Sequence, residues 1–238
     1  MFRNPLPFAK RYRYELAILG LMTLASAICL FMVAARLGYS GSIGYTNLVW
    51  NLFLAWIPFL LSYAAYLLSE RRRLLYLVIP VTAFLWLIFF PNAPYILTDL
   101  QHLARDSQAA PLWYDVIMLN WFSWTGLLLG LISLYFMHEI VRRTFGRWVG
   151  WAFVFLVAGL SSFGVYLGRF ARFNSWDLLQ APGETAVSIL GLVIDPSRRL
   201  LAFTALFAVF YLFVYLTLYS FGHLFREKEG DQHGAEAE

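Results

Sequence analysis

The stretch LLAFTALFAVFYLFVYLTLYSFG, from Leu200 to Gly222, contains no Asp, Glu, Lys, Arg or His. It meets the requirement of roughly 20 apolar residues for an α-helix that crosses a bilayer. Unpaired backbone amides are costly in hydrocarbon, so the stretch should close its own hydrogen bonds as a helix. Five further stretches share both properties: Leu16–Ala35, Thr46–Ser69, Leu74–Thr98, Val116–Met137 and Trp148–Gly168. The sequence therefore predicts an all-α integral membrane bundle of about six transmembrane helices.

Little of the chain lies outside these stretches. Charged residues make up 13% of its 238 residues, against about a quarter in soluble domains. We expect a single six-span transmembrane domain over residues 1–225 and a polar tail, residues 226–238, that is disordered and cytoplasmic. The net charge of +4 comes from basic residues that flank the spans, so the expected partner of this charge is the lipid bilayer and not a nucleic acid.

Lys and Arg residues are divided unequally between the two sides of the predicted bundle. Of the 18 such residues, twelve lie on the side that holds both termini, and six lie on the other side. Cytoplasmic segments carry the excess of Lys and Arg, so we expect both termini in the cytoplasm. The larger set is Arg3, Lys10, Arg11, Arg13, Arg71, Arg72, Arg73, Arg142, Arg143, Arg147, Arg226 and Lys228; the smaller set is Arg36, Arg105, Arg169, Arg172, Arg198 and Arg199.

A first polar motif, FFPNAPYILTDLQHL, runs from Phe89 to Leu103. Pro91 and Pro94 have no backbone N–H, so the third span should break or end there. Asn92 suits the N-cap of a following helix, in which Pro94 is tolerated in the first turn. We therefore expect a short interfacial or re-entrant helix after span three.

This short helix should have two different faces. Asp99, His102 and Asp106 follow at i, i+3 and i+7 and would form a polar, titratable face, with Arg105 beside them. The apolar face would consist of Ile96, Leu97, Leu100, Leu103 and Ala104. Two interpretations are open: a functional site, or a capped and solvated surface helix.

A second polar motif, GRFARFNSWDLL, runs from Gly168 to Leu179. Arg169 and Arg172 lie three residues apart and would point the same way on a helix that continues from span five. A pair of planar guanidinium groups suits a phosphate or a carboxylate. In the alternative interpretation these arginines anchor the helix through salt bridges to Asp99, Asp177 or lipid phosphates.

The two motifs together resemble the signature stretches of an uncharacterised bacterial membrane-protein family, the domain of unknown function numbered thirteen sixty-one. The resemblance extends from about the second span to the sixth. It implies a multi-pass protein of the bacterial inner membrane, and it supplies no catalytic residues to carry over.

Two patterns of known membrane enzymes fail on spacing. The segment Gly159–Ser162 approaches the G-x-S-G of rhomboid proteases, but at 1.5 Å per residue His223 would lie about 30 Å from Ser161. The zinc motif H-E-x-x-H begins at His138, but Arg142 occupies its second histidine position. We assign no catalytic residue, and we predict no metal and no cofactor; Asp99, His102 and Asp106 would still suit a carboxylate-rich metal site.

The outer loops are longer than the cytoplasmic ones, and polar residues collect at the outer ends of the spans. We therefore predict an outward-facing polar pocket that binds or processes an anionic or lipid-linked ligand, and we leave open whether the protein is an enzyme. In this hypothesis Asp99 and His102 lie close to the second motif. The candidate ligand-binding residues are Asn92, Tyr95, Asp99, His102, Arg169, Arg172, Asn174, Trp176 and Asp177.

Two alternatives stay open. The protein could be a non-catalytic assembly or accessory protein whose outer loops bind a partner, or a small-solute transporter. Transport ranks last because the apolar stretches contain no ionisable residues, which ion and proton pathways usually need. Gly126 and Gly130 form a G-x-x-x-G motif that allows close helix packing, either within the chain or in a homo-oligomer.

The first testable prediction concerns orientation. Reporter fusions at residue 238 and within residues 106–111 should place the former in the cytoplasm and the latter outside it, because of the Lys and Arg distribution. A reporter that is active in the periplasm when fused to the C-terminus would overturn this orientation.

Overall fold

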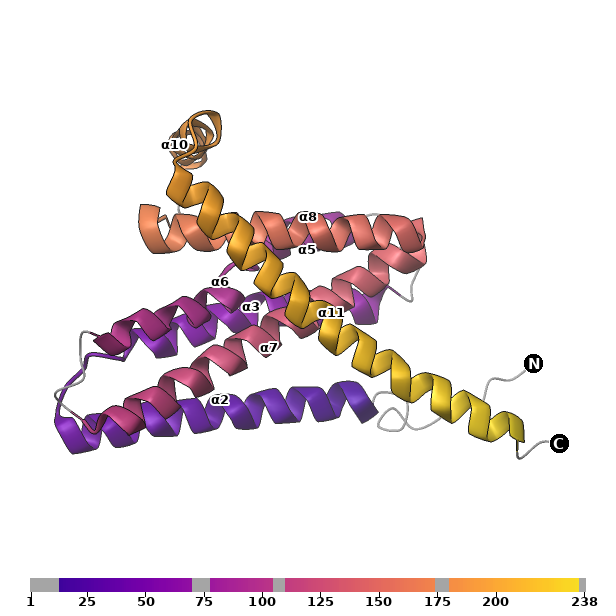
Figure 1. The fold of residues 1–238 in the computed structure, drawn as a ribbon, viewed down its shortest axis with the longest axis horizontal. Helices are drawn as coiled ribbons and strands as arrows, with labels where there is room; N and C mark the ends of the chain where they lie inside the picture. Colours follow the sequence, from indigo (N-terminus) through magenta and orange to yellow (C-terminus); the bar gives the residue numbers. More distant parts are fainter. Residues whose placement is uncertain (1–12, 70–77, 105–109, 174–179, 236–238) are drawn as a thin grey trace. The chain divides into compact units, whose positions relative to one another are not determined.

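The computed structural model describes residues 13–69, 78–104, 110–173 and 180–235, and within these ranges the chain is helical and contains no strand. Its helices, labelled as in Figure 1, are α2 (Arg13–Ser40), α3 (Asn47–Leu68), α5 (Val78–Phe89), α6 (Asn92–Tyr95), η1 (Ile96–Ala104), α7 (Leu112–Phe145), α8 (Arg147–Tyr166), η2 (Leu167–Ala171), α10 (Pro182–Ile194) and α11 (Arg198–Ala235). Six segments in this part of the chain are long and apolar enough to cross a membrane, and each overlaps one predicted stretch. The predicted all-α bundle is confirmed, and the chain is a multi-pass membrane protein.

The chain divides into two compact units, Met1–Met137 and His138–Glu238, and α7 runs through the boundary. The sequence predicts one transmembrane domain over residues 1–225. Helix α11 continues to Ala235, so helical backbone covers most of the segment 226–238, for which composition predicts disorder. We call the two parts unit 1 and unit 2 and describe each by itself.

In unit 1, α3 packs against α5 and α6 (Figure 1). A chain of buried hydrogen bonds adds α7 to this group. The indole N–H of Trp86 on α5 donates to Ser133 Oγ on α7 at 2.7 Å, and the Ser133 hydroxyl donates to the carbonyl of Pro58 on α3 at 3.0 Å. These polar groups satisfy one another where water cannot, so they join three helices without leaving an unpaired group.

The third span is interrupted where the prolines predict it. Helix α5 ends at Phe89, residues 90–91 form a turn, and α6 and the 3₁₀-helix η1 follow. The predicted N-cap role of Asn92 is wrong, since Pro91 occupies the cap position and no side chain caps α6. The Asn92 amide instead donates to the carbonyl of Phe89 at 2.9 Å. Asn92 therefore satisfies the end of the preceding helix, whose carbonyls lose partners because prolines follow.

Gly126 on α7 marks a close approach of helices in unit 1. A Cβ atom at this position would lie 2.8 Å from the carbonyl oxygen of Ala93 and 2.8 Å from Cδ1 of Ile96. The missing side chain thus lets α7 pack directly on α6 and the start of η1. Gly130, one turn further along, is also buried. A homo-oligomer through Gly126 and Gly130 stays a prediction.

In unit 2, α8 and α11 pack side by side and run antiparallel. Trp151 contacts Tyr219 near one end of the pair, and Tyr166 contacts Phe203 near the other end. Several of the buried residues of α8 are small: Ala158, Ser161 and Ser162 are buried, and Gly150 lies against His138 and Arg142 at the end of α7. Such residues leave room for large side chains from the neighbouring helix. Tyr211 and Tyr215 of α11 are accordingly buried.

The Gly126 contact gives the second testable prediction. Gly126→Ala should lower the free energy of unfolding in detergent by about 1–3 kcal/mol, because the added methyl group overlaps a backbone oxygen that cannot rotate away. Gly159→Ala is the matched control, since a Cβ at Gly159 meets no atom within 4 Å. Thermal unfolding of both variants in one detergent measures the difference. Equal midpoints for the two variants would contradict the close approach at Gly126.

Candidate functional site

Charged groups are buried at one end of unit 1, where α2 ends and α7 begins. The Arg36 guanidinium donates to both carboxylate oxygens of Asp115, at 2.7 Å and 3.1 Å. Both side chains are almost completely buried, with 1% and 0% exposed. Asp115 also lies in the first turn of α7, where the helix dipole stabilises a negative charge. The bidentate pair therefore fixes the end of α2 to the start of α7.

Tyr45 connects this ion pair to η1. Its buried ring lies 4.3 Å beneath the Arg36 guanidinium carbon, a cation–π contact. Its hydroxyl donates to the backbone carbonyl of His102, at the long distance of 3.4 Å. The segment between α2 and α3 thus bridges the ion pair and the short helix after span three.

Asp99 and His102 form the second part of this cluster. The Asn51 amide of α3 donates to Asp99 Oδ2 at 2.8 Å, and His102 Nε2 lies 3.6 Å from Asp99 Oδ1. The Asp99 side chain is 1% exposed, whereas that of His102 is 26% exposed. The separation is too long for a strong hydrogen bond, but a buried carboxylate next to a partly exposed imidazole is a typical proton-transfer pair. We call Arg36, Tyr45, Asn51, Asp99, His102 and Asp115 the polar network.

Of the two interpretations of the helix after span three, the capped and solvated surface helix does not hold at Asp99, whose side chain is 1% exposed. Residues three apart lie directly above one another in a 3₁₀-helix, which has three residues per turn. Ile96, Asp99 and His102 therefore share one face, and both Ile96 and Asp99 are buried. In an α-helix, which the pattern of polar and apolar residues predicts, the polar and apolar residues would separate onto opposite faces. Arg105 and Asp106 lie outside the described residues.

The other two predicted site residues of unit 1, Asn92 and Tyr95, lie in α6, a few residues before Asp99 in the chain. Asn92 bonds to Phe89, as described above, and the Tyr95 carbonyl accepts a hydrogen bond from the Thr98 hydroxyl at 2.6 Å. Their roles in ligand binding stay predictions. Sequence reasoning did not include Arg36, Tyr45, Asn51 or Asp115 among the site residues. One signal was available: Arg36 and Asp115 have opposite charge and flank spans one and four on the same predicted side.

In unit 2, the second motif departs from the expected α-helix. Residues Leu167–Ala171 form the π-helical turn η2, and Arg172 leaves the helix with a left-handed φ of 62°. The backbone N–H groups of Arg172 and Phe173 both donate to the carbonyl of Leu167. The prediction that Arg169 and Arg172 lie on one α-helical face is therefore wrong, because the helix widens and ends between them.

A third arginine reaches the same turn from α11. The guanidinium carbon of Arg199 lies 4.1 Å above the ring of Phe170, and this ring also contacts Tyr166 and Phe203. Arg169 is half-buried, and Arg172 is exposed. Residues Asn174, Trp176 and Asp177 lie outside the described residues. The predicted meeting of this motif with Asp99 and His102 stays a prediction.

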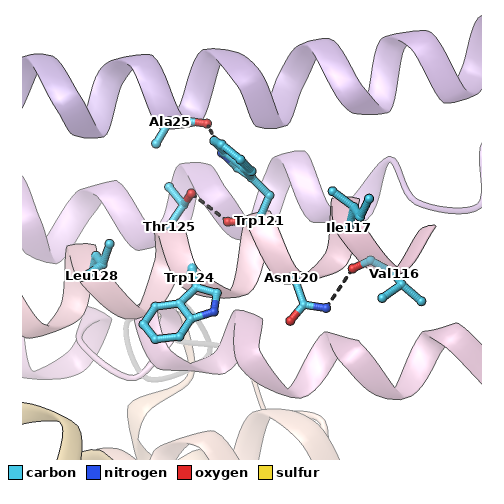
Figure 2. A pocket seen from close by; sticks show the side chains of 8 residues that line it. All are labelled: Ala25, Val116, Ile117, Asn120, Trp121, Trp124, Thr125 and Leu128. Atoms are coloured by element: carbon cyan, nitrogen blue, oxygen red, sulfur yellow. Dashed lines mark hydrogen bonds between the residues drawn. The ribbon is translucent and has the colours of Figure 1, made fainter. Parts of the chain in front are cut away.

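A groove of about 470 Å³ lies between α2 and α7 in unit 1 (Figure 2). It is lined by Ala25, Val116, Ile117, Asn120, Trp121, Trp124, Thr125 and Leu128. A smaller hollow of about 200 Å³ follows along the same pair of helices, toward the Arg36–Asp115 pair. Its lining residues are Ala35, Arg36, Tyr39, Ala110, Pro111, Trp113 and Tyr114.

No group of three His, Cys, Asp or Glu side chains that could hold a metal occurs among the residues that the structure describes. Asp99 and His102 are close together, but Asp106, the third member of the set considered from sequence, is not among the described residues.

Comparison with known proteins identifies a family. The model of a family of proteins of unknown function, DUF1361, matches residues 50–215. The match includes both polar motifs, together with α3 from Trp50 onward and α11 up to Tyr215. No curated protein and no solved structure matches the chain.

The third testable prediction concerns the Arg36–Asp115 pair. Arg36→Met alone or Asp115→Leu alone should lower the free energy of unfolding by about 3–5 kcal/mol, because each leaves a buried charge without its partner. The double variant should lose much less, since it buries neither charge. Denaturant titration in mixed micelles would measure the three variants against wild type. Additive losses in the double variant would show that the two residues are not coupled.

Proposed function

The chain belongs to this family of proteins of unknown function. From its own residues we propose that it is a bacterial inner-membrane protein. We propose that it binds an anionic ligand at the face of that membrane that points away from the cytoplasm. Both termini then lie in the cytoplasm, which the distribution of Lys and Arg supports. The ligand offers a phosphate or carboxylate group, either on a lipid headgroup or on a lipid-linked molecule.

The observation that carries this proposal is the arginine-rich turn at the end of α8. Arg199 of α11 stacks on Phe170, and Phe170 lies between Arg169 and Arg172 in the sequence of the turn. The charge bias assigns this end to the outer side, where arginines are less common. Guanidinium groups bind phosphates and carboxylates through paired N–H donors, and stacking on Phe170 occupies the face of Arg199 and not its donor edge.

The backbone at Arg172 supports a functional role for this turn. A residue with a side chain prefers negative φ, and a left-handed conformation costs about 1 kcal/mol or more. Glycine would avoid this cost, yet the chain has arginine here, following directly on a π-helical turn. Both features occur preferentially at functional sites. The strained backbone is explained if this position needs an arginine side chain for ligand binding, although glycine would fit the backbone conformation better.

The polar network of unit 1 supplies a separate candidate for proton transfer. His102 is partly exposed and lies next to the buried Asp99 carboxylate. A carboxylate at this distance can orient the imidazole, which is the geometry of a general acid or base. If the protein processes its ligand, we propose His102 as the residue that exchanges a proton, and we assign no reaction.

One observation favours a non-catalytic assembly or accessory protein as the second candidate. The Arg36–Asp115 pair is closed, bidentate and buried, so it acts as a structural clamp and not as an open site. Transport still ranks last. At 1.5 Å per residue, Asp115 and His138 lie about 35 Å apart along α7. That separation places both near the boundaries of a hydrocarbon core about 30 Å thick, and not in its middle, where an ion pathway would need ionisable groups.

The fourth testable prediction separates binding from stability at Arg172. Arg172→Gly should raise the free energy of unfolding by about 1 kcal/mol, because glycine adopts the left-handed conformation without strain. The same variant should weaken binding of phosphatidylglycerol about tenfold, the effect of losing about 1.4 kcal/mol. Arg172→Lys should give an intermediate affinity, because lysine keeps the charge but not the planar fork.

Arg147→Gln is the matched control, since Arg147 is an exposed arginine at the opposite end of α8. Native mass spectrometry of each detergent-solubilised variant, titrated with phosphatidylglycerol, would give the affinities. The proposal fails if Arg172→Gly and Arg147→Gln bind this lipid as tightly as wild type. A loss of stability in Arg172→Gly would instead identify Arg172 as a structural residue.

A further inference from the structure

The groove between α2 and α7 lies at the depth of lipid chains. Ala25 belongs to the candidate span Leu16–Ser40, and the other lining residues belong to Leu112–Phe145. From Val116 to Leu128 the groove follows α7 for about 18 Å at 1.5 Å per residue. One leaflet of a hydrocarbon core about 30 Å thick has a similar depth. The groove therefore has the length of one leaflet.

Three of the polar side chains that line this groove donate hydrogen bonds to carbonyl groups of the protein (Figure 2). The Trp121 indole N–H donates across the groove to the Ala25 carbonyl at 3.2 Å. The Thr125 hydroxyl donates to the Trp121 carbonyl, and the Asn120 amide donates to the Val116 carbonyl, each at 2.8 Å. What the walls offer to an occupant is therefore mainly aliphatic surface and aromatic rings, with the Trp124 indole N–H and the Asn120 side chain as polar groups. A polar solute would find few hydrogen-bonding partners here, whereas a hydrocarbon chain needs none.

Hydrocarbon is also the medium that surrounds the groove. An empty groove would deprive its lining of dispersion contacts on one side. Trp121 and Trp124 are large, rigid rings with 40% and 56% of their surface exposed, and together they make a wall along which an extended chain can lie. Because a bilayer supplies acyl chains at every depth of the groove, the expected occupant is an acyl chain.

The smaller hollow lies where the polar end of such a lipid would be. It lies at the end of α2 and the start of α7, and it is lined in part by Arg36. Tyr39 and Trp113 are 75% and 64% exposed there, and amphipathic aromatic side chains prefer the headgroup level of a membrane. The Arg36 charge is already matched by Asp115, so the hollow suits the glycerol and ester region of a lipid and does not require an anion.

We propose that a membrane phospholipid binds along α2 and α7, with one acyl chain in the groove and its glycerol region in the hollow beside Tyr39 and Trp113. This inference goes beyond the proposed function and does not depend on it. A second copy of the chain or a polyprenyl lipid would be a different occupant, and the experiment distinguishes these from a phospholipid.

The test uses the full chain in phosphatidylethanolamine–phosphatidylglycerol vesicles that contain a phospholipid with a diazirine in the middle of one acyl chain. After irradiation, labelled peptides are mapped by mass spectrometry. Residues 116–128 should be labelled at least about fivefold more than the exposed face of α11 around Leu206 and Phe213, a ratio that corresponds to about 1 kcal/mol. Equal labelling of the two faces would overturn the inference.

Variants of two alanines on α2 locate the label. Ala25→Phe fills the groove and should reduce labelling of residues 116–128 to the level of α11. Ala27→Phe makes the same change on the same helix at an exposed residue outside the groove, and it should leave the labelling unchanged. Trp124→Ala removes one wall without filling the groove and should also reduce labelling. Undiminished labelling in both Ala25→Phe and Trp124→Ala would contradict the inference.

Three further outcomes separate the occupants and the two proposals. Absence of lipid label on residues 116–128, together with a dimeric mass in native mass spectrometry, would identify a second copy and overturn the inference. So would displacement of the label by polyprenyl phosphate but not by unlabelled phospholipid. Arg172→Gly should leave labelling of the groove unchanged, so failure of the proposed function and failure of this inference give different results.

Discussion

The lack of hydrogen-bonding partners in hydrocarbon is the constraint on which this structure depends. Each backbone polar group inside a span must find a partner in the protein, and most buried polar side chains do the same. Hydroxyls such as those of Thr23, Ser26 and Ser162 donate to the carbonyl four residues earlier in their own helix. Indole groups reach further, as Trp86 and Trp121 each donate to another helix. Helix packing in unit 1 is therefore specified by a few polar contacts as well as by shape, because the apolar side chains gain little from leaving lipid.

The same constraint explains where the charges lie. Of the charged residues that the structure describes in unit 1, Arg36 and Asp115 are buried near helix ends and Asp99 is buried within η1, and each has a close polar partner. Burial at the membrane boundary strengthens such contacts relative to open water. In unit 2 the arginine-rich turn differs, since Arg172 is exposed and its backbone is strained. One end of unit 1 is thus closed by matched charges, while the turn in unit 2 presents cations.

What could be predicted from the sequence was local. Apolar runs identify the spans, and Pro91 and Pro94 locate the break, because these properties need no knowledge of distant residues. Helix type was not predictable: a 3₁₀-helix carries Asp99 and a π-helical turn precedes Arg172, and neither has a clear signal in a single sequence. The pairing of Arg36 with Asp115 spans 79 positions, so only the packing of α2 on α7 reveals it. Asn92 shows that a residue suited to cap one helix can serve its neighbour instead.

The central claim is that this membrane protein carries a ligand-binding surface for anionic, lipid-like molecules. Native mass spectrometry of the full wild-type chain, released from detergent micelles under increasing collision energy, tests it most directly. We expect a chain that retains lipid, with species bearing a phosphate headgroup the last to dissociate, because charge-assisted hydrogen bonds to arginine outlast contacts to acyl chains in the gas phase and in the membrane. A chain that appears at its bare mass at the lowest energies, or bound to a second protein and no lipid, would contradict the claim.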